Sequence, residues 1–221
     1  SLKENGVSLV IYPYDEFALS RALEYQESTK QGSITILCVG GPEVEPTIRK
    51  ALAVGGEEGV RIDATATDAY QIAHYIAEYA RSKSFDLIMM GKESIDFNGA
   101  EVPGMVAEIL SLPFVSFATS LELHGTKAEV LREIEGGTEL LEVDLPFVLS
   151  AQKGLAEWRI ANMRGIMAAR KKAVHVIKPT AVTALTQTVH FELPAGKSGC
   201  QMIDSNDVDK LVDVLAAKGV I

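Results

Sequence analysis

Short apolar runs and amphipathic stretches alternate along the first 120 residues of the chain. The runs Ile34–Val39 and Phe85–Met90 are rich in β-branched and other apolar residues, which is typical of strands covered on both faces. The stretches between them carry apolar residues at helical spacing, such as Ile72, Ile76 and Ala80. This alternation predicts an α/β fold: a Rossmann-like parallel sheet with flanking helices and right-handed crossovers.

Turn and cap residues set the limits of these elements. Strands are predicted at residues 7–11, 34–39, 59–63, 85–90 and 114–118. Helices are predicted after Asp15, which can act as an N-cap, over residues 47–54, after Asp68 and over residues 105–110.

The pattern changes after residue 120. Strand-like segments at 121–123, 128–134 and 139–143 are separated by turns at His124-Gly125 and Gly136-Gly137, which predicts a β-hairpin region. A strand at 146–151, a helix at 162–172 and a strand at 173–177 follow, and then a poorly patterned segment leads to a capped amphipathic helix after residue 204. We therefore predict an α/β domain with its hairpin region over residues 1–180, and a C-terminal arm that ends in a helix over residues 181–221.

Composition and charge narrow the class of protein. The chain has 221 residues and a net charge of −9, which argues against nucleic acid as a partner because phosphate neutralisation needs an excess of Lys and Arg. No apolar run is long enough for a membrane helix, and the first residues do not resemble a signal peptide. The two cysteines stand far apart and without a motif, and Cys38 is expected to be a buried thiol. We expect a cytoplasmic protein of bacterial type without direct membrane insertion.

Motifs of autonomous catalysis are missing from the sequence. It contains no Gly-x-Gly-x-x-Gly after a strand, no Walker phosphate loop, no Gly-x-Ser-x-Gly and no His-Glu-x-x-His. The four histidines are isolated, and His74 stands among tyrosines at a position more typical of packing than of metal binding. We therefore expect no catalytic residue and no metal site.

The segment Gly91–Gly104 is the main candidate for a ligand-binding loop. Ligands of parallel sheets lie beyond the carboxyl ends of the strands, which directs attention to this loop and to those at residues 12–14 and 40–44. The segment follows a buried strand, opens a helix and is rich in small residues, so its backbone and free amides can approach a phosphate. The alternative is a long surface connection.

Four ordered segments resemble the β subunits of electron transfer flavoproteins. Residues 91–96, Gly-Lys-Glu-Ser-Ile-Asp, resemble the Gly-Lys-x-x-Ile-Asp stretch of that family, and residues 12–19 resemble its Asn-Pro-Tyr-Asp-Glu-x-Ala-Leu segment. Residues 132–137 with Leu145-Pro146 are similar to its Arg-Glu-x-Glu/Asp-Gly-Gly…Leu-Pro region. Residues 157–159 and 166–172 are similar to its Glu-Pro-Arg-Tyr…Ile-Met-x-Ala-x-Lys-Lys segment, so the resemblance spans nearly the whole chain.

The resemblance implies a heterodimer with the electron transfer flavoprotein α subunit, which holds most of a redox-active FAD. The β subunit binds a second adenine nucleotide, usually AMP. The pair carries electrons from acyl-CoA or other flavin dehydrogenases, as in fatty acid oxidation, to a membrane quinone oxidoreductase, and residues 181–221 contact the partner subunit. The implied nucleotide contacts in this sequence are Tyr12, Pro13, Tyr14, Asp15, Val44, Gly91, Lys92, Glu93, Ser94, Ile95, Asp96, Phe97, Asn98, Gly99, Ala100, Glu101 and Val102.

The sequence departs from the family within this set. Ala100-Glu101-Val102-Pro103-Gly104 stands where many members have Asn-Gln-Thr-Gly-Gln, and Tyr12 replaces an Asn. Glu101 would repel a phosphate if it pointed inward. The Ala-Glu-Val stretch is similar to the Ala-Gln-Val-Gly of electron-bifurcating relatives, whose β subunit holds a second FAD, and that alternative stays open beside AMP. A stand-alone nucleotide-binding domain, such as an ATP sensor or an adenylating enzyme, is a third alternative.

Two further expectations follow from the resemblance. Family members have a central strand and a nucleotide-holding loop about thirty residues before Asn5-Gly6-Val7, and without them the sheet would have a missing middle; the sequence is either a shortened form or an incomplete domain. The loop by which members grip partner dehydrogenases corresponds to Gly154, Leu155, Ala156, Glu157, Trp158 and Arg159, where an exposed Leu155 would insert into a pocket of the partner. The alternative is that Leu155 and Trp158 pack against the protein's own core.

Overall fold

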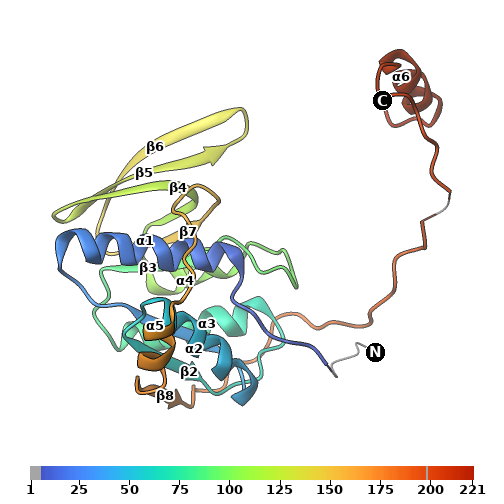
Figure 1. The fold of residues 1–221 in the computed structure, drawn as a ribbon. Coiled ribbons are helices and arrows are strands. Elements are labelled where there is room, and N and C mark those ends of the chain that lie inside the picture. Colours follow the sequence, from blue (N-terminus) through green and yellow to red (C-terminus); the bar gives the residue numbers. More distant parts are fainter. Residues whose placement is uncertain (1–5, 198) are drawn as a thin grey trace. The chain divides into compact units, whose positions relative to one another are not determined.

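The computed structural model of the chain describes residues 6–197 and 199–221 (Figure 1). Contacts divide these residues into two compact units, of which one ends at Thr188 and the other comprises Val189–Ile221. The start of the predicted domain at residues 1–5 and residue 198 of the predicted arm lie outside the described residues. The division by contacts falls after Thr188, so Thr180 and its neighbours belong to the first unit. A domain boundary at residue 180 stays a prediction.

The first unit contains all the strands described. Its helices are α1 (Pro13–Thr29), the 3-10 turn η1 (Pro42–Val44), α2 (Glu45–Val54), α3 (Ala69–Arg81), α4 (Val102–Leu110) and α5 (Met163–Ala169). Its strands are β1 (Thr35–Val39), β2 (Glu58–Ile62), β3 (Leu87–Gly91), β4 (Phe114–His124), β5 (Lys127–Ile134), β6 (Gly137–Asp144), β7 (Phe147–Ala151) and β8 (Val174–Ile177). The predicted alternation of strands and helices, followed by hairpins, is confirmed.

The strands form two sheets. The first is fully parallel and has the order β1-β2-β8, and the second has the order β3-β7-β4-β5-β6. In the second sheet β3, β7 and the start of β4 are parallel, whereas β4, β5 and β6 form antiparallel hairpins. Among the described residues β1 pairs only with β2 and β3 only with β7, so no described strand joins the two sheets.

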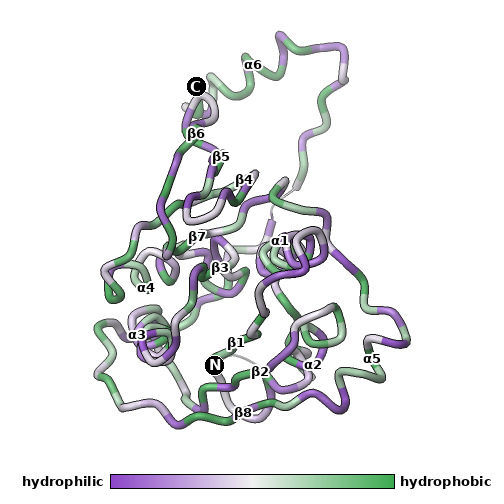
Figure 2. The backbone as a smooth tube through the Cα atoms, turned by 90° about the vertical axis from the view of Figure 1, so that its left-hand side faces the viewer, coloured by the Kyte–Doolittle hydropathy of each residue, from purple (hydrophilic) through white to green (hydrophobic). Residues whose placement is uncertain are grey.

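Helices cover both faces of the strands (Figure 2). On β7, Leu149 packs in one cluster with Ala18 of α1, whereas Val148 points to the opposite face and packs with Val106 of α4. On β2, Val60 packs with Tyr75 of α3, and the other face of the strand lies against α2. The result is one helical layer of α1 and α2 and another of α3 and α4, as expected for a doubly wound α/β fold.

The predicted strand at residues 7–11 is wrong. These residues are not assigned to a strand, and Val7, Leu9 and Val10 are 65%, 42% and 66% exposed. The segment has β-rich composition, but it pairs with none of the described strands, and an isolated extended segment gains no ladder hydrogen bonds. Strand β1, which was expected to be buried on both faces, is half-buried along its whole length.

The N-cap predicted at Asp15 is also wrong. Helix α1 begins at Pro13, whose fixed φ suits the first helical position, and its N-cap is Tyr12, which makes no side-chain capping bond. Asp15 therefore lies within the first turn and has a different partner. By contrast, Asp68 caps α3 as predicted: its carboxylate accepts the Gln71 N–H at 2.9 Å.

The second unit contains α6 (Val208–Ala217), which Asp207 caps by accepting the Lys210 N–H at 3.2 Å. Apolar and charged residues alternate along it, as the colours of Figure 2 show. Leu211 and Val212 remain 44% and 47% exposed. No helix in residues 6–197 and 199–221 is long and apolar enough to cross a membrane.

Asp68 also fixes the segment that leaves β8. While one carboxylate oxygen caps α3, the other accepts the N–H groups of Leu185 and Thr186 at 2.6 and 2.9 Å. Gln71 donates to the Val182 carbonyl at 2.8 Å, so residues 182–186 lie along the start of α3. Partial burial acts against the carboxylate, but these N–H groups outweigh it and lower the pKa of Asp68.

We predict that Asp68→Ala lowers the free energy of unfolding by about 1–2 kcal/mol at pH 7, because a helix cap and two further amide bonds are lost. The folded-state pKa is depressed, so this contribution is fully present above the unfolded pKa of about 4 and is lost as the pH falls below it. Urea unfolding of both forms from pH 7 to pH 3 measures it. Asp86→Ala, which removes an exposed carboxylate, is the control; a difference that stays constant at low pH would contradict the charge-based explanation.

Candidate functional site

The carboxyl end of β3 brings two of the predicted binding segments together. The amide of Gly91, the last residue of β3, donates a 2.6 Å hydrogen bond to Asp15 in the first turn of α1. The segment at Tyr12–Asp15 and the loop that begins at Gly91 are 76 positions apart at this contact and meet at one edge of the sheet. This is the edge at which parallel sheets bind ligands.

Gly91 is required for this close approach. A Cβ atom at residue 91 would lie 2.9 Å from the backbone N of Asp15 and 3.0 Å from Cβ of Tyr14. The Asp15 nitrogen is part of the helix backbone and the Tyr14 Cβ is bonded directly to it, so neither atom can move away by side-chain rotation. The start of α1 and the end of β3 therefore form a rigid junction.

Two groups near the junction, the carboxyl of Asp15 and the thiol of Cys38, have raised pKa values. Crowding by protein atoms raises the pKa of Asp15, and the Gly91 N–H opposes this by stabilising the charged form. Asp15 remains in contact with solvent. Burial, followed by the charges of Asp15 and Glu43, raises the pKa of Cys38 to about 11, so Cys38 is a thiol and not a nucleophile at neutral pH.

Aromatic rings and one lysine surround the junction. Tyr12 and Tyr14 make an edge-to-face contact with ring centroids 5.1 Å apart, and the ammonium of Lys92 lies 4.8 Å from the Tyr14 centroid. The Lys92 Nζ is also 3.2 Å from Glu93. Desolvation acts against the ammonium, but the bonds with Glu93 and Tyr14 outweigh it and raise the pKa of Lys92, which is charged at neutral pH.

The loop beyond Lys92 presents its backbone to solvent. Its turn is closed by the Asn98 N–H, which donates to the Ser94 carbonyl at 2.8 Å. Asn98 and Ala100 have φ of +49° and +52°, and Glu101 returns to the right-handed region at φ −93°. In the part of the chain that the structure describes, the amides of Gly99, Ala100 and Glu101 have no hydrogen-bond partner. Alternation of left- and right-handed residues with free amides is the backbone arrangement that binds anions, so the loop fits a phosphate.

Three side chains of the loop determine the character of its surface. Ile95 and Phe97 are 68% and 76% exposed and make the loop's outer surface apolar. The carboxylate of Glu101 folds over Gly99, where an added Cβ would be 3.1 Å from its Oε1. Glu101 therefore lies beside the free amides, and any anion held there experiences its charge.

Phe117 is a residue of this edge that the sequence analysis missed. It occupies a bulge of β4, where the register against β7 shifts between Val115 and Ala118, and its φ is +55°. A left-handed conformation costs a residue with a side chain about 1–2 kcal/mol. The Phe117 N–H donates to Oγ of the buried Ser150 at 3.0 Å, which replaces a ladder bond. The sequence Ser-Phe-Ala-Thr inside an apolar strand gives no local signal of this bulge.

Val44 lies at the carboxyl end of the other sheet. Its side chain packs over Gly40 and against a cluster that contains Ile48 and Leu52. The neighbouring turn is held by Arg61, which donates to the Gly40 carbonyl at 3.0 Å and pairs with Asp63. A contact between Val44 and a nucleotide stays a prediction.

The expectation of an exposed Leu155 is wrong. Its side chain is 4% exposed and belongs to the core cluster of Ala18, Val115 and Ala118, so Leu155 packs against the protein's own core. The reason is tertiary, because the residues that bury Leu155 come from α1 and β4, far away in the sequence. A leucine in this position has no free surface to insert into a partner.

The rest of the segment is more exposed. Trp158 is 54% exposed, and Arg159 makes bidentate contacts of 2.8 and 3.0 Å with Glu27 of α1, which fix the loop to the helix. Gly154 and Glu157 are exposed and Ala156 is half-buried. Partner binding by these residues stays a prediction, and Trp158 replaces Leu155 as its exposed apolar group.

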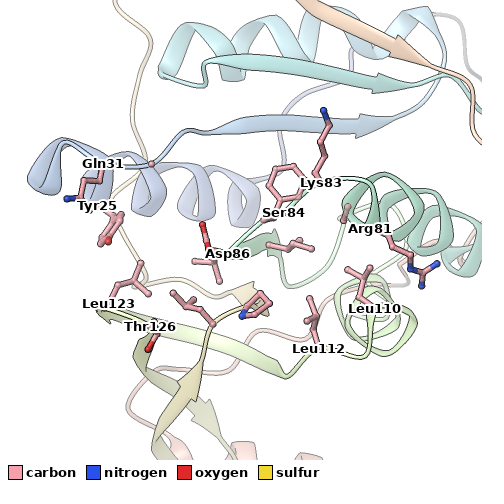
Figure 3. A pocket seen from close by; sticks show the side chains of 18 residues that line it. Tyr25, Gln31, Arg81, Lys83, Ser84, Asp86, Leu110, Leu112, Leu123 and Thr126 are labelled. Atoms are coloured by element: carbon pink, nitrogen blue, oxygen red, sulfur yellow. The ribbon is translucent and has the colours of Figure 1, made fainter.

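A cavity lies at the opposite end of the strands, away from this junction. It has a volume of about 760 Å³ and is lined by residues at the amino ends of the strands, among them Asp86, Leu112 and Thr126. Figure 3 shows side chains of the β3, β4 and α1 ends gathered around it. None of the predicted nucleotide residues lines it. Within residues 6–197 and 199–221, no cluster of His, Cys, Asp and Glu could hold a metal ion.

We predict that Gly91→Ala lowers the free energy of unfolding by about 1–3 kcal/mol, because the new methyl group must displace the first turn of α1. Denaturant unfolding measures it. Gly137→Ala is the matched control, since an added Cβ there meets nothing within 4 Å and the residue has no positive φ. Equal stability of the two variants would contradict the rigid junction.

Comparison with known proteins places the chain in one family. Residues 1–182 match the family described as "Electron transfer flavoprotein domain". The chain is similar to "Electron transfer flavoprotein subunit beta" of Syntrophomonas wolfei subsp. wolfei, with 35% identity over 209 residues that cover 94% of this chain and 83% of that protein. It is 36% identical to the protein of the same description from Bacillus subtilis, over 80% of this chain and 70% of that protein. For the Homo sapiens protein the identity is 34%, over 79% of this chain and 71% of that protein. The chain therefore belongs to the family of electron transfer flavoprotein β subunits.

Proposed function

We propose that this chain binds an adenine nucleotide at the junction of α1 and β3 and works as half of a heterodimer whose α subunit holds most of the FAD. The observation that carries the proposal is the contact of Gly91 with Asp15. It brings the segment Tyr12–Asp15 beside a loop in which three described amides, those of Gly99, Ala100 and Glu101, have no hydrogen-bond partner. Both segments are those that the family resemblance implies for the nucleotide.

The roles of the residues follow from their positions. The amides of Gly99, Ala100 and Glu101 would hold the phosphate, and Tyr12 and Tyr14 would border the ligand at the start of α1. The rigid junction at Gly91 orients the two sides of the site relative to each other. The flavin, when bound, supplies the redox chemistry, so this chain needs no acid–base pair of its own.

The nucleotide is proposed to be AMP, and a second FAD is the alternative. AMP needs only a backbone phosphate site, which the open amides fit. The Ala100-Glu101-Val102 stretch keeps the alternative of a bifurcating complex open, because it lacks the Asn, Gln and Thr side chains that many AMP-binding members have.

The heterodimer is proposed to carry electrons from acyl-CoA or other flavin dehydrogenases to a membrane quinone oxidoreductase, in fatty acid oxidation in the cytoplasm. The exposed Trp158, next to the Arg159–Glu27 pair, is the proposed dehydrogenase contact. A stand-alone sensor or adenylating domain is less favoured, because the chain belongs to a family of subunits.

The test is the nucleotide content of the chain purified with its α subunit, released by acid and quantified by chromatography. One FAD and one AMP per heterodimer would support the proposal. Two FADs without AMP would assign the chain to the bifurcating class. One FAD with no second nucleotide would contradict nucleotide binding by this chain.

We predict that Glu101→Gln lowers the dissociation constant of AMP about two- to fivefold at low salt, because a charge beside the phosphate is removed. The gain should shrink at high salt, where exposed charges are screened. Isothermal titration calorimetry at two ionic strengths measures both effects. Glu108→Gln, on the exposed face of α4, is the matched control, and an unchanged affinity in Glu101→Gln would place the phosphate away from this loop.

A further inference from the structure

A groove follows the outer strand of the first sheet, β8, on the side of α3. The register pairs Val60 of β2 with His175 of β8, so these two side chains point to the same face of the sheet. Glu58 and Ile177 lie two positions along their strands from this pair and share that face. The groove between this face and α3 has a volume of about 590 Å³, which is within the range of small-molecule sites.

Two buried tyrosines form the wall of this groove. Tyr75 and Tyr79 lie one helical turn apart on α3 and are only 5% and 8% exposed. Both line the groove and pack with Val60 and Ile62 of β2. Neither hydroxyl has a hydrogen-bond partner among the described residues, and neither oxygen is sealed from solvent. A buried tyrosine hydroxyl is ordinarily paired, so these two can bind a polar atom that enters the groove.

A carboxylate lies near these hydroxyls. Burial, followed by the charge of Glu58, raises the pKa of Tyr79, so the field of Glu58 reaches the tyrosine hydroxyl. The recorded partner of Glu58 is Nε2 of His175 at 3.4 Å, which is longer than a charge-assisted hydrogen bond of roughly 2.7–2.9 Å. The other carboxylate of the groove, Glu78, accepts the N–H and hydroxyl of Thr180 at 3.1 and 2.6 Å. Glu58 is therefore the carboxylate with capacity for a further cation.

The remaining lining residues favour an organic cation over an anion. Tyrosine rings, hydroxyl oxygens and a carboxylate are the groups that recognise an ammonium. The apolar side chains of Val60 and Ile177 suit a hydrocarbon chain attached to it. Lys83 and Lys178 also line the groove, but both are exposed, and an anion between the strands would lie beside Glu58.

We propose that the groove between α3 and β8 binds a short primary alkylammonium. Glu58 pairs with the ammonium, and the hydroxyl of Tyr79 accepts a hydrogen bond from it. The alkyl chain lies on Val60 and Ile177. None of the residues proposed above for the nucleotide lines this groove, so the site is separate from the proposed function and does not depend on it.

The experiment titrates pentylammonium chloride into the ¹⁵N-labelled full chain and follows the amide signals by NMR. Pentylammonium should shift the signals of Glu58, Tyr79 and His175 with a dissociation constant on the order of 1 mM, as expected for so small a ligand. Pentan-1-ol, which has the same chain without the charge, should bind roughly fivefold more weakly or worse, and pentanoate more weakly still. Glu58→Gln should weaken pentylammonium about three- to tenfold, and Tyr79→Phe about two- to fivefold.

Two matched controls test the assignment of these residues. Tyr70→Phe removes a hydroxyl of α3 outside the groove, and Glu108→Gln removes an exposed carboxylate of α4; neither should change the affinity for pentylammonium. Equal binding of pentylammonium and pentan-1-ol, a preference for pentanoate, or shifts that do not include the groove would overturn the proposal. An unchanged affinity in Glu58→Gln would overturn it as well. The nucleotide content of the heterodimer tests the proposed function separately.

Discussion

The contact between Gly91 and the first turn of α1 is the constraint on which the carboxyl edge of this protein depends. Strand β3 ends where α1 begins, and the two backbones approach so closely that no side chain fits at residue 91. The hydrogen bond from Gly91 to Asp15 places a carboxylate among protein atoms that raise its pKa. The loop that follows leaves from a fixed point, with Lys92 already directed over Tyr14. Order in an otherwise exposed loop therefore comes from one backbone junction.

The elements that the sequence predicted correctly are those determined by local pattern. Hydrophobic periodicity and glycine turns predict the strand–helix alternation and the hairpins, and Asp68 caps α3 because a cap needs only the three residues that follow it. The errors concern contacts between distant residues. Asp15 was expected to cap its own helix, but its partner Gly91 is 76 positions away, and the β-rich segment at residues 7–11 has no strand to pair with.

The wrong prediction for Leu155 and the omission of Phe117 have the same kind of cause. Leu155 was expected at the surface because a related loop grips a partner, yet its burial depends on Ala18 and Val115 from distant elements. Phe117 was missed because its conformation arises from the way β4 serves two neighbours: its first part pairs with β7 in parallel and its last part with β5 in antiparallel fashion. A strand that changes partners accumulates a register shift, and the bulge absorbs it.

Anion binding at the proposed nucleotide site depends on the backbone of the loop rather than on the charges of its side chains. The chain carries a net charge of −9, and the loop itself contains Glu93, Asp96 and Glu101 but only one lysine. Anion binding there must come mainly from backbone amides, whose dipoles do not depend on side-chain identity. Such binding does not require an Asn, Gln or Thr side chain in the loop. The single lysine of the loop, Lys92, lies against the rings of Tyr14 and Phe117.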